Sequence, residues 1–291
     1  MQPTPAESLE IRTLLQSLCG VSLADDKAYL LSTRLANPLR IRGLTSFTDY
    51  LAQLRQPANQ ALRDELIDCL TTAETSFFRD ASLYGVLRQR LLPWLADLLY
   101  RRSLTAVTPP VVRLWSAGCS TGQEPYSLAI AIAEFLRGQA APHPRQFSLV
   151  ATDISCRVLT IAQRGVYSQR ELERGLTAAQ RERFFRHCGE DWEISPELKR
   201  AVEFRLANLL DPSGPAGPFD LIFCRNVLIY FDPATRVRIC ERFYRALNPG
   251  GILVLGSAES LFGVTDLFTT APGEELPIYR RPDPETDGPA V

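Results

Sequence analysis

The sequence is poor in histidine and has no excess of charge of either sign. It contains only two histidines, His143 and His187, which disfavours a histidine-based metal site or an acyl-transfer triad. Its 32 basic and 33 acidic residues give a formal net charge of −1, which does not favour nucleic acid as a partner. We therefore expect no metal site and no nucleic-acid ligand.

Paired cysteines and long apolar runs are also missing. The seven cysteines are odd in number, scattered, and without the close spacing of a metal knuckle, which is typical of reduced core or loop residues. They are Cys19, Cys69, Cys119, Cys156, Cys188, Cys224 and Cys240. No apolar run approaches the length of a membrane helix, and the start "MQPTPAESLE" lacks a secretory signal pattern. These absences favour a cytoplasmic protein without direct membrane insertion.

The first third of the chain has a helical pattern. With 291 residues, 45% of them hydrophobic, the chain can form one large or two smaller packed domains. Apolar residues three and four apart predict helices from Leu9 to about Arg102, for example in "LEIRTLLQSLCG" and "NQALRDELIDCLTT". We predict a helical N-terminal domain, with its linker, over residues 1–102.

After "TAVTPP" the pattern changes to short apolar runs that alternate with segments of helical length. The runs "VVRLWSAG", "FSLVATD", "FDLIFCRN" and "GILVLGS" predict strands, and "YSLAIAIAEFLRG" and "ATRVRICERFYRAL" predict helices. Such alternation predicts an α/β domain, a parallel sheet with helices on both faces, over residues 103–281. Residues 282–291 have no apolar periodicity, and we expect them to be disordered.

Ligands of such sheets bind at the carboxyl ends of the strands. There, "LWSAGCSTGQEPYS" leaves a strand through Gly118 and Gly122, which permit a tight turn and a close approach of the backbone to a ligand. Asp153 ends the next strand and can accept both hydroxyls of a ribose, with Glu124 as a second carboxylate. The spacing is not GxGxxG. A strand-to-helix turn without a ligand, and a Glu124 placed by the helix dipole, remain as alternatives.

The stretch "FDLIFCRNVLIYFD" predicts a buried strand with a polar exit at the same edge of the sheet. Asn226 offers both a donor and an acceptor, and Tyr230 follows one helical turn later. Both side chains can face one ligand if the chain turns helical at once. Alternatively, Asn226 caps that helix and Tyr230 fills the core.

Five segments together resemble the chemotaxis-receptor glutamate O-methyltransferases of the CheR type. They are "TTAETSFFRD", "SAGCSTGQEPYSLAI", "ATDIS", "ANLL" and "FCRNVLIYFD", in matching order within residues 9–281. The resemblance implies a small helical domain joined to a Rossmann-like class I methyltransferase domain. It also implies a small inserted antiparallel β-subdomain, at about residues 186–204. The implied activity transfers the methyl group of S-adenosylmethionine to receptor glutamates for sensory adaptation, with S-adenosylhomocysteine as product.

The same resemblance assigns the site residues. The positions that match cofactor contacts are Thr75, Arg79, Glu124, Asp153, Asn208, Leu209, Arg225 and Asn226, to which the residue pattern adds Gly118. Tyr230 matches an active-site tyrosine, and we expect Arg79 to orient the cofactor or the junction segment. Ala73 stands where many members carry asparagine, which puts one polar contact to the cofactor in doubt.

The junction from Thr71 to Asp80 is expected to form a lid over the cofactor. In this interpretation Phe77 and Phe78 close apolar surface and Arg79 points inward. A capping box of Thr71 with Glu74, followed by two core phenylalanines and a surface arginine, is the structural alternative, and it is compatible with a lid.

The expected partner is the helical methylation region of a methyl-accepting receptor, which carries glutamates in this family. Arg34, Arg40 and Arg42 concentrate positive charge in a near-neutral chain, and we expect them to dock this region. A solvated arginine face is the alternative. Some members also bind a receptor C-terminal peptide through the β-subdomain. The sequence leaves that tether open, and we expect a monomer.

Two other functions compete with methyl transfer. A non-catalytic signalling scaffold could keep the fold, although the intact Arg79, Asp153, Asn226 and Tyr230 argue against it. A nicotinamide-dependent oxidoreductase could use a similar sheet, but the glycine fingerprint is wrong for it.

Overall fold

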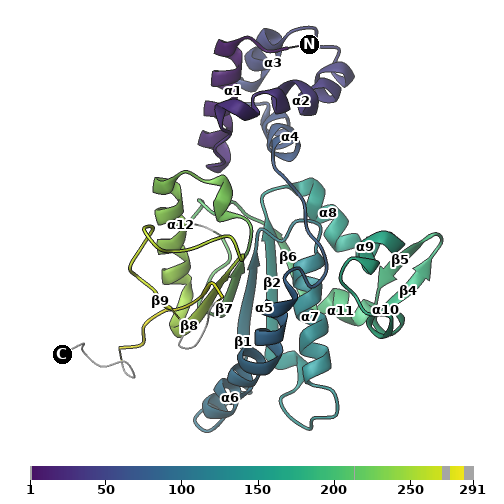
Figure 1. Ribbon diagram of the computed structural model, residues 1–291, viewed down its shortest axis with the longest axis vertical. Helices are drawn as coiled ribbons and strands as arrows, with labels where there is room; N and C mark the ends of the chain where they lie inside the picture. Colours follow the sequence, from purple (N-terminus) through teal and green to yellow (C-terminus); the bar gives the residue numbers. More distant parts are fainter. Residues whose placement is uncertain (1, 213, 271–275, 285–291) are drawn as a thin grey trace.

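The computed structural model describes residues 2–212, 214–270 and 276–284. A small helical domain lies above the upper edge of an α/β domain, and a single extended segment of the chain connects the two domains (Figure 1). Most of the predicted disordered tail, residues 285–291, lies outside the described residues.

The N-terminal domain is helical, as predicted. Its four α-helices are α1 Pro5–Cys19, α2 Tyr29–Ile41, α3 Phe47–Leu54 and α4 Gln60–Leu70, with a 3₁₀ turn at Asp25–Lys27. Thr4 and Glu7 form a capping box at the start of α1, and Gly20 ends this helix with a φ of 76°. The four helices bury a core of their own, which includes Leu15, Leu31, Tyr50 and Leu66.

The next helical segment belongs to the other domain, which corrects the predicted boundary after residue 102. It runs through α5 Ala81–Val86, a π-helical turn Leu87–Leu91 and α6 Leu92–Ser103. Its buried leucines share one core with the sheet residues Val112 and Leu114. A helical pattern marks an amphipathic helix but not the layer against which it packs. The cores therefore separate near residue 71, ahead of the junction.

A seven-stranded sheet forms the centre of the α/β domain. Its strands stand in the order β6-β2-β1-β7-β8-β10-β9. They are β1 Val112–Ala117, β2 Phe147–Asp153, β6 Val202–Leu206, β7 Phe219–Cys224, β8 Leu247–Leu255, β9 Thr269–Thr270 and β10 Ile278–Arg280. The first five are parallel, as predicted, and β10 and β9 add an antiparallel edge. Chain order reverses at β1, which lies between β2 and β7, so ligands are expected there.

Helices cover both faces of the sheet, as the alternating pattern predicted. On one face Leu114 and Phe223 share a core with α5, α6 and α7 (Gln123–Phe135). On the other, Trp115 and Ile222 pack with α12 (Pro233–Ala246) (Figure 1). Further short helices of the domain include a 3₁₀ turn Pro144–Gln146, α8 Cys156–Arg164 and a 3₁₀ turn Leu228–Tyr230.

A separate three-stranded antiparallel sheet projects from the side of the domain, in the order β3-β5-β4. Its elements are β3 Val166–Tyr167, α9 Gln169–Glu173, α10 Ala178–Phe184, β4 Phe185–Cys188 and β5 Asp191–Ile194. The predicted range 186–204 is therefore wrong at both ends. After α11 (Pro196–Ala201), Val202–Leu206 pairs with β2 in the main sheet. This edge strand is half exposed and carries alternating charged residues. The sequence therefore shows no continuous apolar run at this position.

Candidate functional site

A cavity lies where the helical domain meets the carboxyl ends of β1, β2 and β7. Its empty volume is about 980 Å³, which includes space that is open to the solvent. Every residue assigned to the cofactor or to catalysis lines it: Thr75, Arg79, Gly118, Glu124, Asp153, Asn208, Leu209, Arg225, Asn226 and Tyr230. The structure thus brings together residues from five separate stretches of chain. Their contact with a cofactor remains a prediction.

The exit of β1 bends sharply before α7 begins. Gly118, Ser120 and Gly122 have φ values of 78°, 51° and 97°, all in the left-handed region. A Cβ at Gly118 would lie 2.5 Å from Cγ2 of Val227, in the exit of β7. Glycine is therefore required at this position for the close approach of two strand exits, as well as for the turn.

Asp153, at the end of β2, organises the neighbouring loop. Its Oδ2 accepts the Ser120 N–H at 2.8 Å and its Oδ1 accepts the Ser155 N–H at 3.0 Å. Burial raises the pKa of this carboxyl group, and the two backbone donors oppose that rise. Because each oxygen has two lone pairs, the carboxylate keeps acceptor capacity for hydroxyl groups in the cavity.

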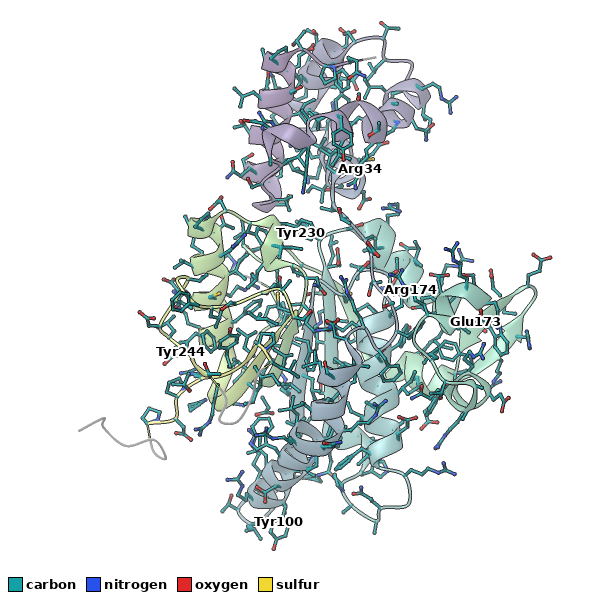
Figure 2. The ribbon with its side chains drawn as sticks, viewed as in Figure 1. Arg34, Tyr100, Glu173, Arg174, Tyr230 and Tyr244 are labelled. Atoms are coloured by element: carbon teal, nitrogen blue, oxygen red, sulfur yellow. The ribbon has the colours of Figure 1, made fainter. Side chains whose placement is uncertain are left out.

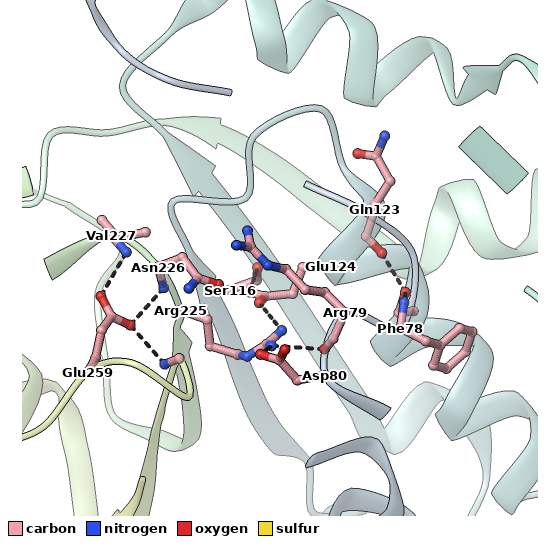
Figure 3. A network of polar contacts seen from close by, with 12 residues as sticks. Phe78, Arg79, Asp80, Ser116, Gln123, Glu124, Arg225, Asn226, Val227 and Glu259 are labelled. Atoms are coloured by element: carbon pink, nitrogen blue, oxygen red, sulfur yellow. Dashed lines mark hydrogen bonds and ion pairs between the residues drawn. The ribbon is translucent and has the colours of Figure 1, made fainter. Parts of the chain in front are cut away.

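Arg225 is the centre of a buried ion-pair network (Figure 3). Its Nη1 donates to Glu124 Oε2 at 3.2 Å, and its Nη2 donates to Asp80 Oδ2 at 2.5 Å and to the backbone oxygen of Arg79 at 2.8 Å. Burial alone would lower the Arg225 pKa, but the carboxylates of Glu124 and Asp80 raise it above its usual value. The guanidinium therefore stays charged and joins β7 to α7 and to the junction.

Glu124 is the buried acidic partner in this network. Its Oε1 accepts the Ser116 hydroxyl at 2.7 Å. Burial raises the pKa of Glu124, and the neighbouring Arg225 opposes the rise. Glu124 lies in the first turn of α7, where the helix dipole favours a carboxylate. Its hydrogen bonds to Ser116 of β1 and to Arg225 show that it also connects the helix to the sheet.

The junction is pinned to the α/β domain by its two phenylalanines. The Phe77 ring is fully buried against Tyr167 and Phe185, with centroids 5.0 Å and 5.6 Å away. The Phe78 N–H donates to Ser127 Oγ at 2.9 Å. Phe78 and Asp80 both have left-handed backbones, with φ of 47° and 65°, a strain typical of segments held by their surroundings.

The capping-box alternative for the junction is wrong. Thr71 follows the last turn of α4, where its hydroxyl donates to the Ile67 oxygen at 2.8 Å, and the next helix starts only after Asp80. Arg79 lies in the cavity wall, and its Nη1 donates to the Glu74 oxygen at 3.2 Å. The backbone oxygen of Ala73 accepts the Ser120 hydroxyl at 2.8 Å, so this position is held by its main chain.

The short 3₁₀ turn after β7, Leu228–Tyr230, has Val227 and not Asn226 at its N-cap, so the capping alternative for Asn226 is also wrong. Asn226 has a φ of 57°, and α12 begins later, with Asp232 as its N-cap. Among the described residues, the buried Oδ1 of Asn226 has no hydrogen-bond partner. Such an unsatisfied acceptor on a cavity wall is expected where a ligand binds.

The sequence did not identify a glutamate that contacts this loop. The carboxylate of Glu259 accepts the backbone N–H groups of Asn226 and Val227 at 2.7 Å and 2.9 Å (Figure 3). A single glutamate in the polar stretch "GSAES" carries no signal of this contact, because the partners are more than 30 residues away.

The helical domain forms one wall of the cavity and contacts the loops around Tyr230. The Asn208 side-chain amide donates to the backbone oxygen of Leu18 at 2.9 Å, and the Ser22 N–H donates to the backbone oxygen of Tyr230 at 2.8 Å. Tyr230 lies directly below the helical domain (Figure 2). The placement of Asn208 and Tyr230 therefore depends on contacts between the two domains.

The three arginines of the predicted docking patch differ in their contacts. Arg34 Nη1 donates to the Leu70 and Thr71 oxygens at 3.1 Å and 3.2 Å, so it stabilises the end of α4 and the start of the junction. Arg42 pairs with Glu65. Arg40 is exposed and donates to Asn37 Oδ1 at 2.8 Å. Arg34 is thus a structural residue, which weakens the prediction of one three-arginine patch.

In residues 2–212, 214–270 and 276–284, no group of three or more His, Cys, Asp or Glu side chains could hold a metal ion. Over the same residues, no helix has both the length and the apolar character to cross a membrane.

The Arg225 network can be tested by its effect on stability. Arg225→Met should lower the free energy of unfolding by about 3–5 kcal/mol, because it leaves the Glu124 carboxylate buried without its cation. Adding Glu124→Gln should recover part of the loss. As a control, Arg101→Met removes an exposed pair with Asp97 and should cost less than about 1 kcal/mol. Urea unfolding followed by circular dichroism measures all four proteins; equal losses for Arg225→Met and Arg101→Met would contradict the prediction.

Two family models match nearly the whole chain. The description "CheR methyltransferase, all-alpha domain" matches residues 6–71, and "CheR methyltransferase, SAM binding domain" matches residues 73–276. The division between the models falls where the two cores separate.

Curated relatives cover almost the same length. The chain is 39% identical to a "Chemotaxis protein methyltransferase" of Vibrio anguillarum, over 90% of this chain and 92% of the relative. It is 38% identical to "Chemotaxis protein methyltransferase 1" of Pseudomonas aeruginosa, over 92% of this chain and 95% of the relative. The solved N-methyltransferase NodS from Bradyrhizobium japonicum WM9 overlaps 68% of this chain and 100% of its own, with 18% identity and a TM-score of 0.33.

Proposed function

The chain belongs to the CheR methyltransferase family, and from this premise we propose that it methylates glutamate side chains of a methyl-accepting chemotaxis receptor. S-adenosylmethionine is the methyl donor, and the products are glutamate methyl esters and S-adenosylhomocysteine. The observation that carries the proposal is the convergence of all the family-matched positions on one cavity at the carboxyl ends of β1, β2 and β7. The receptor, rather than a small molecule, is inferred from the names of the relatives.

The residues of the cavity fit S-adenosylmethionine, which supplies an electrophilic methyl group on a sulfonium centre. Asp153 has spare acceptor capacity for the ribose hydroxyls. Asn226 presents a buried Oδ1 without a partner among the described residues. The carboxylates of Asp153 and Glu124 complement a cationic ligand, and Gly118 keeps the strand exit free of a side chain.

The reaction requires a correctly positioned carboxylate and no general base. A glutamate carboxylate has a reference pKa of about 4.3, so it is ionised at pH 7 and is already the nucleophile. No residue of this chain needs to remove a proton. Holding the carboxylate in line with the methyl group can supply on the order of 7 kcal/mol of the barrier.

Charge loss during the reaction limits what the arginines can do. A carboxylate and a sulfonium neutralise each other as the methyl moves, so a close cation would stabilise the ground state more than the transition state. Arg225 forms ion pairs with Glu124 and Asp80, and Arg79 donates a hydrogen bond to the backbone oxygen of Glu74. We assign Arg79 to orientation of the junction and the cofactor, and the Tyr230 hydroxyl to direction of the carboxylate by one neutral hydrogen bond.

The wider setting is part of the same proposal. We place the enzyme in the cytoplasm as a monomer, where it meets the cytoplasmic methylation helices of the receptor. A non-catalytic scaffold is less consistent with the retained polar residues of the cavity, and the oxidoreductase alternative is abandoned because the family model covers residues 73–276.

Transfer of label tests the proposed function directly. The protein is incubated with S-adenosylmethionine labelled with tritium in its methyl group and with a receptor cytoplasmic fragment. Volatile, base-labile label on the fragment is expected, because methyl esters release methanol in base. A fragment whose methylatable glutamates are changed to alanine serves as the control. Binding of S-adenosylmethionine without transfer to any receptor fragment would favour the scaffold.

Tyr230→Phe should lower turnover while leaving the affinity for S-adenosylmethionine within about twofold, because only the hydrogen bond to the carboxylate is lost. Removal of one neutral hydrogen bond corresponds to about 0.5–1.5 kcal/mol, or roughly 2- to 13-fold in rate. Initial rates with saturating receptor fragment, beside calorimetric titration of the cofactor, separate the two effects. Full turnover by Tyr230→Phe would remove the tyrosine from the reaction.

Asn226→Ala should weaken S-adenosylmethionine binding by roughly 1 to 3 kcal/mol, the cost of leaving buried polar partners unsatisfied. The fold should be retained, because the backbone bonds of Asn226 to Glu259 do not involve its side chain. Calorimetry measures the affinity, and circular dichroism checks folding. A folded variant that binds as tightly as the parent would exclude Asn226 from the site.

Arg40→Glu should slow receptor methylation several-fold at low salt, and the effect should fade as salt screens the charges. Arg101→Glu is the matched control, since Arg101 is also an exposed helical arginine. It lies in α6 beside Tyr100, at the end of the molecule opposite to the helical domain (Figure 2). Equal rates for the two variants at low salt would contradict docking through Arg40.

A further inference from the structure

One buried carboxylate, that of Glu259, holds the loop that leaves β7. Its Oε2 accepts the backbone N–H groups of Asn226 at 2.7 Å and Gly256 at 2.8 Å. Its Oε1 accepts those of Val227 at 2.9 Å and Ile229 at 3.4 Å. Glu259 is only 7% exposed, and its carboxylate faces this loop (Figure 3).

The loop needs such an acceptor because its conformation is unusual. Asn226 is left-handed, with a φ of 57°, a conformation that is uncommon for residues other than glycine, although asparagine adopts it more readily than most. Three of its N–H groups, at Asn226, Val227 and Ile229, converge on the same side chain. An ionised carboxylate has two oxygens and about four lone-pair sites, which matches these donors and the fourth from Gly256.

Gly256 closes the arrangement from the other side. A Cβ at this position would lie 2.8 Å from Glu259 Oε2 and 2.9 Å from both the backbone nitrogen and the side-chain Nδ2 of Asn226. Gly256 directly follows β8, so the exits of β7 and β8 meet with only the carboxylate between them. An added methyl group must therefore displace the loop, the carboxylate or the Asn226 amide.

We propose that Glu259 is a positioning residue for methyl transfer. It sets the backbone from Asn226 to Ile229 and thereby aims the Asn226 amide into the cavity and places Tyr230 on its wall. The inference rests on the proposed function, because it assigns Glu259 to the S-adenosylmethionine site.

Two variants perturb this arrangement in different ways. Glu259→Gln keeps the shape of the side chain, but its NH₂ group would face two N–H donors and leave them unpaired. Gly256→Ala keeps the carboxylate and pushes the loop away from it. Each should weaken S-adenosylmethionine binding by about tenfold or more, because either change misplaces the Asn226 amide.

Asp220→Asn is the matched control for a loss of stability alone. Asp220 is 1% exposed at the opposite end of β7, where it accepts hydrogen bonds from Arg102, the Arg113 N–H and Asn248. Its replacement should lower the thermal midpoint and leave the affinity for S-adenosylmethionine within about twofold of the parent.

The experiment measures S-adenosylmethionine affinity by calorimetry and the thermal midpoint by circular dichroism, at a temperature where each protein is folded. Loss of affinity in Glu259→Gln and Gly256→Ala, but not in Asp220→Asn, is the expected result. If Glu259→Gln does not fold, the affinity of Gly256→Ala, compared with that of Asp220→Asn, tests the inference. Variants that lose midpoint but bind as tightly as Asp220→Asn would reduce Glu259 to a structural residue and overturn the inference.

The parent protein separates this inference from the proposed function. If the parent does not bind S-adenosylmethionine, both are overturned. If it binds the cofactor but labels no receptor fragment, the receptor activity fails, while the affinities of the variants still decide the role of Glu259.

Discussion

A buried guanidinium, that of Arg225, connects the parts of the chain that surround the cavity. It leaves β7 and reaches Glu124 on α7, and it reaches Asp80 and the Arg79 oxygen in the junction. A charge in the interior is tolerated only with its partners, so a conformation that keeps Arg225 paired must also keep the junction against the sheet. The junction, which lines the cavity, is thereby part of the core of the α/β domain.

The other wall of the cavity depends on the helical domain. Main-chain and amide bonds from the end of α1 and from Ser22 reach Asn208 and Tyr230, on two loops of the α/β domain. Neither domain alone encloses the site. This division agrees with an acceptor that is itself a protein, because a receptor helix could then contact the helical domain and the reaction centre together.

Four of the five parallel strands, and the ends of those four strands, could be predicted from the sequence. Runs such as that of β7 are apolar and short, and their polar exits at Asp153 and Asn226 identify one edge of the sheet. Two elements were misassigned for a physical reason. The edge strand β6 is too exposed to have an apolar pattern, and the helix from Ala81 to Ser103 has an amphipathic pattern that suits either domain.

By itself, the sequence determined the class of fold, the alternation of its main strands and helices and which polar residues follow the predicted strands, because these depend on neighbours along the chain. Only the tertiary structure decided the partners of those residues. Arg34 stabilises a helix end 36 residues away, Glu259 holds a loop 33 residues away, and Arg225 pairs with Asp80 at a separation of 145. Local patterns contain no record of such contacts, since they form only when packing brings distant segments within hydrogen-bond distance.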